Sequence, residues 1–209
     1  ERLPIRAIEF STDQALRKQL ADHLFASYES DGAADPERLL LSVNEEISNE
    51  RYDVVHDFLV SLAQAMLTLN ERRQIEIQSF LTWLESCLHI RPDKGGATGI
   101  DSLAGKTILQ NYLGDYQKDE RARSWDEFYH RLFQNRRRFS VSLEDVKGEI
   151  EAEYEKSLAV LLPIKEQLEF TDNLIDKIVY RLYGLTEEEI AIIEGPAFQQ
   201  AQADAKAAV

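Results

Sequence analysis

The chain has 209 residues, 38 of them acidic against 24 Lys and Arg, and a formal net charge of −14. Its hydrophobic content of 44% is typical of a folded protein, whereas its negative charge argues against a free-standing, non-specific nucleic-acid binder, which needs surplus positive charge. The single cysteine, Cys87, excludes an internal disulfide, and no apolar run is long enough to span a membrane.

Residues that break helices are scarce, with nine Gly and five Pro in the whole chain. Long stretches instead repeat apolar residues with the helical period of 3.6. We therefore expect a mostly α-helical protein, an elongated helical bundle with two long helices and a short extended N-terminal lead-in. One long helix could form a coiled-coil arm.

The first half of the chain divides into a lead-in and a helical region. Residues 1–10 contain Pro4 and partly alternate, which predicts an extended linker or edge strand. Residues 11–91 form the helical region, which Ser11 and Gln14 could open with a capping box. Its last helix is expected to start around Asp53 and to run for about 35 residues, against a usual length of about 12.

The second half is expected to contain one loop, several short helices and a second long helix. Residues 92–105 hold four of the nine glycines and form the loop, and residues 106–139 form short helices, one opened by a capping box of Ser124 and Glu127. Residues 140–195 form the second long helix, over 143–183, and a short terminal helix, and residues 196–209 form a frayed tail. Pro163 predicts a kink or a break in the long helix, because proline lacks a backbone donor.

A glycine-rich stretch in the loop is similar to a phosphate-binding loop. Gly99 and Gly105 precede Lys106 and Thr107, but five residues separate the two glycines where the Walker pattern has four. No buried strand is predicted before it. We therefore interpret it as a flexible loop that ends in a helix cap, and we assign no catalytic, cofactor-binding or metal-ligating residue.

Charge is distributed unevenly along the second half. Residues 121–140 carry a net charge of +4, and residues 144–194 carry −9. The basic stretch could clamp phosphate groups, because guanidinium groups bind phosphate through paired hydrogen bonds. Alternatively, it could pair internally with the acidic long helix. The candidate contacts to DNA phosphate, called the arginine cluster below, are Arg121, Arg123, Arg131, Arg136, Arg137 and Arg138.

The stretch from Thr171 to Gly195, which contains LIDKIVYRLYGLTEEEIAIIEG, resembles the C-terminal end of large bacterial adenine-specific DNA methyltransferases of the type IIG restriction–modification class. Weaker likenesses in other parts of the chain support this resemblance. Residues 3–10 are similar to the linker after the target-recognition domain of that family, residues 56–66 and 80–85 to its helical region, and residues 103–107 to a recurrent turn there.

This resemblance implies a non-catalytic C-terminal region of a larger bacterial, cytoplasmic enzyme. The Asn-Pro-Pro-Tyr type of methylase loop is missing, since no two of the five prolines are adjacent. The implied parent enzyme would use S-adenosylmethionine, and the catalytic and target-recognition domains upstream in the same protein would be partners of this region, with DNA bound through the parent. The absence of an initial Met fits a fragment. Whether the parent cleaves DNA stays open, and the alternative is a stand-alone helical adaptor that binds protein.

Overall fold

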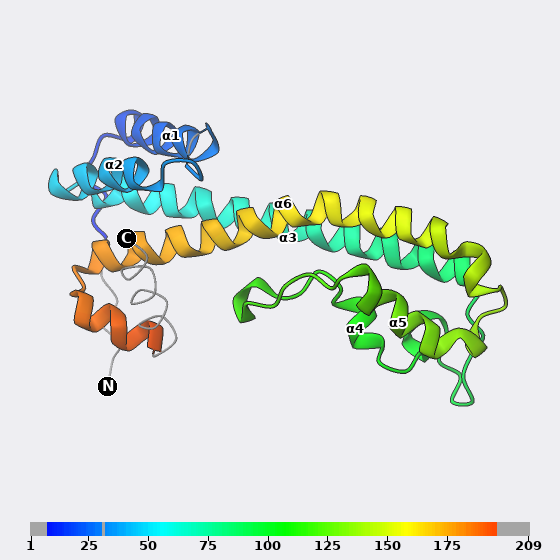
Figure 1. The fold of residues 1–209 in the computed structure, drawn as a ribbon. Coiled ribbons are helices and arrows are strands. Elements are labelled where there is room, and N and C mark those ends of the chain that lie inside the picture. The colour runs from blue at the N-terminus through cyan, green and yellow to red at the C-terminus, as the bar shows by residue number, and fades with distance from the viewer. Residues whose placement is uncertain (1–7, 31, 196–209) are drawn as a thin grey trace. The chain divides into compact units, whose positions relative to one another are not determined.

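The computed structural model describes residues 8–30 and 32–195. Within them the chain is mostly α-helical, as expected, and the described part contains one isolated antiparallel β-bridge, between Ile90 and Phe139. Residues 187–195 form a further helical segment. The elements, drawn in Figure 1, are α1 (Gln14–Ser30), α2 (Pro36–Ser48), α3 (Tyr52–Leu88), η1 (Gly99–Ser102), α4 (Lys106–Gln110), η2 (Tyr116–Lys118), α5 (Trp125–Asn135), η3 (Arg136–Arg138) and α6 (Leu143–Tyr183), where η denotes a 3-10 helix.

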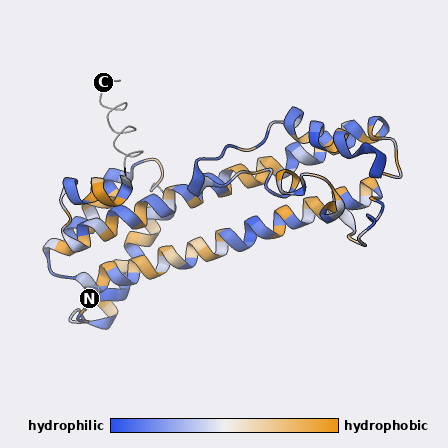
Figure 2. Cartoon of the chain, turned by 90° about the horizontal axis from the view of Figure 1, so that it is seen from below, coloured by the Kyte–Doolittle hydropathy of each residue, from blue (hydrophilic) through white to orange (hydrophobic). Residues whose placement is uncertain are grey.

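The two predicted long helices are α3, with 37 residues, and α6, with 41 residues. Of the kink or break predicted at Pro163, the break is wrong, since α6 continues through this residue. Pro163 lies on the exposed side of α6, between the buried residues Leu161 and Ile164. Figure 2 shows hydrophobic and hydrophilic residues interleaved along both long helices, as expected for helices that bury one face.

Side chains at the helix ends explain where the elements begin and end. The capping box of Ser124 and Glu127 is present at the start of α5. At α1 the prediction was wrong, because Asp13 rather than Ser11 accepts hydrogen bonds from the first backbone amides of the helix. Gly184 ends α6 in the left-handed conformation, with a φ of 65° that favours glycine.

Two sequence predictions fall at the chain ends. Residues 1–7 of the extended lead-in and the tail over 196–209 lie outside the described residues. Residues 8–10, which are described, have no regular secondary structure.

The chain forms two compact units, and the first combines segments from both halves of the sequence. Unit 1 consists of Glu1–Gln64 and Thr171–Val209. The hydroxyl groups of Tyr28 in α1 and Thr171 in α6 form a buried hydrogen bond of 2.7 Å. The buried hydrophobic residues of unit 1 are Ala21, Leu24, Tyr28, Leu39, Leu40, Val43, Val54, Val55, Phe58, Leu62, Leu174, Ile178 and Leu182.

Unit 2, Ala65–Phe170, has an aromatic core. Phe128 of α5 stacks on Tyr154 of α6 with ring centroids 4.5 Å apart, and Phe80 of α3 lies 5.1 Å from Tyr112. Both buried tyrosine hydroxyls have partners. Tyr112 shares a hydrogen bond of 2.7 Å with the Ser157 hydroxyl, and Tyr154 donates to a backbone carbonyl at 2.7 Å. These contacts join α3, α5 and α6 and position the arginine cluster on the surface of unit 2.

Candidate functional site

The six residues of the arginine cluster lie in and around α5, within unit 2. Arg121 and Arg123 precede the helix, Arg131 lies in its second half, and Arg136–Arg138 form the adjoining η3. They therefore belong to one continuous segment, but their side chains have very different surroundings.

The charge of Arg121 is neutralised by a local carboxylate. Its two terminal nitrogens each donate to one oxygen of Glu127 at 2.7 Å. This pair, together with the backbone N–H of Ser124, lowers the pKa of Glu127 to about 2. Arg121 therefore completes the cap of α5 and has less charge to offer a phosphate group.

Arg123 is held in place by its backbone. Its N–H donates to the carbonyl of Tyr112 at 2.7 Å, and its carbonyl accepts from the hydroxyl of Tyr154 at 2.7 Å. The side chain is half-buried, and its Nε has no hydrogen-bond partner among the described residues. This residue connects the segment before α5 to the core of unit 2.

Arg131 covers the turn whose sequence is similar to a phosphate loop. A Cβ added to Gly105 would lie only 2.8 Å from its guanidinium, and the φ of Gly105 is +68°. Asn135, one turn later in α5, accepts from the N–H of Ala104 at 2.9 Å and donates to its carbonyl at 3.0 Å. Side chains of α5 therefore hold the turn at the backbone positions where a phosphate loop would bind its ligand. In addition, no strand precedes the turn in the described chain, whereas a phosphate loop follows a strand.

Arg138 is also used inside the fold. Its two terminal nitrogens donate to the carbonyls of Ser102, at 3.3 Å, and Arg91, at 2.6 Å. The N–H of Arg91 in turn donates to the carbonyl of Arg138 at 2.9 Å. This residue ties η3 to η1 and to the segment that follows α3.

Arg136 and Arg137 are the two members of the arginine cluster that are exposed and have no carboxylate partner among the described residues. The guanidinium of Arg136 stacks on the ring of Phe133, 4.0 Å from its centroid, and donates to the carbonyl of Phe133 at 2.9 Å. The side chain of Arg137 forms no hydrogen bond or ion pair within the described chain. These two guanidinium groups retain the donors that a phosphate needs.

The charge pattern suggested that the arginine cluster forms ion pairs with the acidic helix α6. No ion pair joins the arginine cluster to α6 within residues 121–183. Tyr129 of α5 instead makes polar contacts with α6, since it donates to Glu144 at 2.9 Å and its ring lies under the ammonium group of Lys147. Most of the arginine side chains bond backbone carbonyls or their own helix.

Sequence reasoning missed three residues that shape this surface. Asn135 holds the turn before α4, Phe133 orients Arg136, and the exposed Arg91 lies next to Arg138 through the β-bridge. The spacing of Phe133 and Arg136, three residues apart near a helix end, could have indicated the stacking. The position of Arg91 depends on a backbone pairing across 47 residues, for which the local sequence carries no signal.

Searches of protein-family models, of curated proteins and of solved structures find no match to this chain. In the described ranges, no group of three or more His, Cys, Asp and Glu side chains could hold a metal ion. No described helix combines the length and the apolar character that crossing a membrane requires.

Proposed function

We propose that this chain is a non-catalytic helical region of an adenine-specific DNA methyltransferase or restriction–modification enzyme, which braces the target-recognition domain and contacts DNA phosphates. The resemblance of residues 171–195 to the end of that family supports the assignment. The observation that carries the DNA contact is the exposed pair Arg136 and Arg137 on η3, whose guanidinium groups have no carboxylate partner among the described residues.

The surroundings of this pair favour phosphate as its ligand. Stacking on Phe133 restricts the side chain of Arg136, so that less conformational entropy is lost when it binds. Arg138 and Asn135 anchor the backbone on either side through their own hydrogen bonds. A rigid turn with two outward guanidinium groups suits a phosphodiester backbone, which is recognised without regard to base sequence.

The test is the double substitution Arg136→Ala/Arg137→Ala in the full parent enzyme. We expect weaker binding to all DNA sequences and a slope of log K against log salt concentration that is shallower by about 2, because about one counterion is released per phosphate contact. The measurement is a salt titration of DNA affinity by fluorescence anisotropy.

Arg72→Ala is the matched control, because Arg72 is exposed on α3 and lies outside the arginine cluster. It should leave both affinity and slope unchanged. Arg138 stays intact in this experiment, since its loss would also disturb the fold. An unchanged slope in the double variant would contradict the proposed contact.

A stand-alone adaptor that binds another protein is the second candidate, favoured by Leu67 and Ile75 on α3, which are 65% and 61% exposed. The reading frame upstream of Glu1 separates the two functions. A frame that continues into an Asn-Pro-Pro-Tyr loop supports the methyltransferase region, whereas a Met codon directly before Glu1 supports the adaptor. Methyl transfer by residues 1–209 alone would contradict both.

A further inference from the structure

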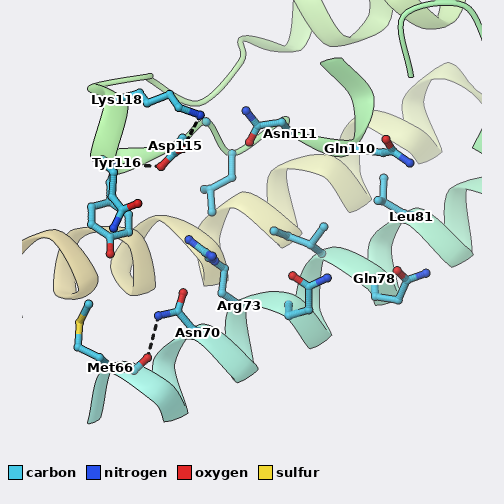
Figure 3. Close-up of a pocket in the computed structure, with 15 residues that line it drawn as sticks. Met66, Asn70, Arg73, Gln78, Leu81, Gln110, Asn111, Asp115, Tyr116 and Lys118 are labelled. Atoms are coloured by element: carbon cyan, nitrogen blue, oxygen red, sulfur yellow. Dashed lines mark hydrogen bonds and ion pairs between the residues drawn. The ribbon is translucent and has the colours of Figure 1, made fainter. Parts of the chain in front are cut away.

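Unit 2 contains an open groove on the side of α3 that faces the segment from Gln110 to Lys118, with a volume of about 710 Å³. Figure 3 shows residues of α3 on one side and of this segment on the other. We call it the amide groove. It is lined by Met66, Asn70, Arg73, Gln74, Ile77, Gln78, Leu81, Gln110, Asn111, Leu113, Gly114, Asp115, Tyr116, Gln117 and Lys118.

The wall formed by residues 110–118 is firmly held. Lys165 of α6 donates to the carbonyls of Leu113 and Glu120. Glu120 accepts from the side chain of Asn111 at 3.0 Å and from the N–H of Asp115 at 3.3 Å. Gly114 has a φ of +74°, and a Cβ there would lie 2.5 Å from the carbonyl oxygen of Glu120. The groove is thus preformed, which lowers the entropy lost when a ligand binds.

The length of the groove suits an extended chain. From Met66 to Leu81, α3 advances about 22 Å at about 1.5 Å per residue. An extended peptide advances about 3.3 Å per residue, so six or seven residues would fill the groove. Met66, Ile77 and Leu81 add apolar surface among the polar residues of the groove.

Carboxamide side chains dominate the lining. Each carboxamide has two N–H donors and one acceptor oxygen. A carboxamide of the groove that bonds within the fold uses only one of its donors for that bond, as Asn70 does toward the carbonyl of Met66. A peptide backbone presents the same alternation of N–H donors and C=O acceptors. The six carboxamides are Asn70, Gln74, Gln78, Gln110, Asn111 and Gln117.

Arg73 supplies a positive charge within this lining that forms no ion pair in the described chain, although, together with the hydrogen bond from Lys118, its field helps to lower the pKa of Asp115. Arg73 is half-buried, extends into the groove in Figure 3, and has no hydrogen-bond or ion-pair partner in the described chain. The nearby carboxylate of Asp115 is already bound by Lys118 at 3.0 Å and by the N–H of Gln117 at 3.1 Å. Arg73 can therefore donate two hydrogen bonds to an incoming carboxylate.

We propose that the amide groove binds an extended segment of another polypeptide that carries an acidic side chain, with Arg73 holding the carboxylate and the carboxamides holding the backbone. A nucleic-acid strand fits less well. Such a strand needs a strongly positive groove with several stacking aromatic rings, whereas this groove has two cations, one carboxylate and a single aromatic residue, Tyr116. The proposal is independent of DNA contact by η3.

The test begins with a selection from a library of randomised twelve-residue peptides displayed on their mRNA, with immobilised residues 1–209 as the target. Enriched sequences are synthesised with capped ends, and their affinities are measured by fluorescence anisotropy. We expect enriched peptides to contain Asp or Glu, and their replacement by Asn or Gln to weaken binding at least tenfold. Arg73→Gln should weaken binding by a similar factor, because it removes one charge-assisted interaction.

Arg72→Gln is the matched control, with the same change of charge on an exposed residue outside the groove, and should change affinity less than twofold. Gln117→Ala is a second groove variant that should weaken binding even if Arg73→Gln disturbs the fold. The proposal is overturned if no peptide binds the native chain more tightly than both groove variants, or if the enriched peptides lack acidic residues. It is also overturned if Arg73→Gln reduces binding of a sixteen-nucleotide single-stranded DNA but not of peptides.

Discussion

At the scale of single residues, some arginines of one short segment bond within the fold, whereas others are exposed and available to a ligand. Arg138 donates to backbone carbonyls, Arg131 lies against Gly105, and Arg121 pairs with Glu127. Within the arginine cluster, Arg136 and Arg137 are the members that are exposed and have no carboxylate partner among the described residues, and these two remain for an external ligand. Counting arginines therefore overstates the number of phosphate contacts that this surface can make.

The Arg121–Glu127 pair makes a prediction for pH dependence. Because the pKa of Glu127 falls from 4.5 to about 2 on folding, its contribution to stability is fully present above about pH 4.5 and is lost as the pH falls toward 2. We expect Glu127→Gln to be less stable than the native chain at pH 7, and the difference to shrink between pH 4.5 and 2. Urea unfolding at pH 7, 4 and 2.5 measures it, and a difference independent of pH would contradict the assignment.

At the scale of elements, the long helix α6 tolerates a proline that removes one backbone hydrogen bond. Pro163 lies on the exposed side of the helix, while Leu161, Ile164 and Leu168 are buried. Packing of these residues is what keeps α6 helical on both sides of the proline. Local propensity predicted the kink or break, and burial of the flanking apolar residues opposed a break.

Pro163→Ala should therefore stabilise the protein. A proline inside a helix costs about 3 kcal/mol relative to alanine, and the exposed ring contributes little packing, so we expect the free energy of unfolding to rise by about 1 to 3 kcal/mol. Equilibrium urea unfolding provides the measurement, with Glu166→Ala, an exposed position on the same helix, as a control expected within about 0.5 kcal/mol. Destabilisation would mean that the core depends on the altered helix geometry at Pro163.

At the scale of the whole molecule, the chain contains two cores of different connectivity. Unit 2 is one continuous stretch, Ala65–Phe170, whereas the core of unit 1 combines α1–α3 with Leu174, Ile178 and Leu182 of α6. The hydrogen bond between Tyr28 and Thr171 joins residues 143 positions apart. Forming a contact between residues so far apart requires the long intervening chain to be ordered. Unit 1 therefore depends on the covalent connection between its two segments.

Fragments test this difference in connectivity. We expect residues 65–170 to remain helical and to unfold cooperatively in urea, because the aromatic core of unit 2 lies entirely within them. Residues 1–64 alone should lack a cooperative transition, since the buried residues Leu174 and Ile178 are missing. Circular dichroism during urea titration measures both fragments, and a cooperatively folded 1–64 would show that unit 1 does not need its second segment.

The sequence by itself determined the helical class, the bounds of the two long helices and the capping box at Ser124, because hydrophobic period and capping chemistry act over a few residues. Only the tertiary structure decided which arginines are exposed and which bond carbonyls. It also decided that a glycine-rich turn is clamped by Asn135 and that an amide groove forms beside α3. These features depend on contacts between residues that are distant along the chain, and no local pattern of side chains specifies such contacts.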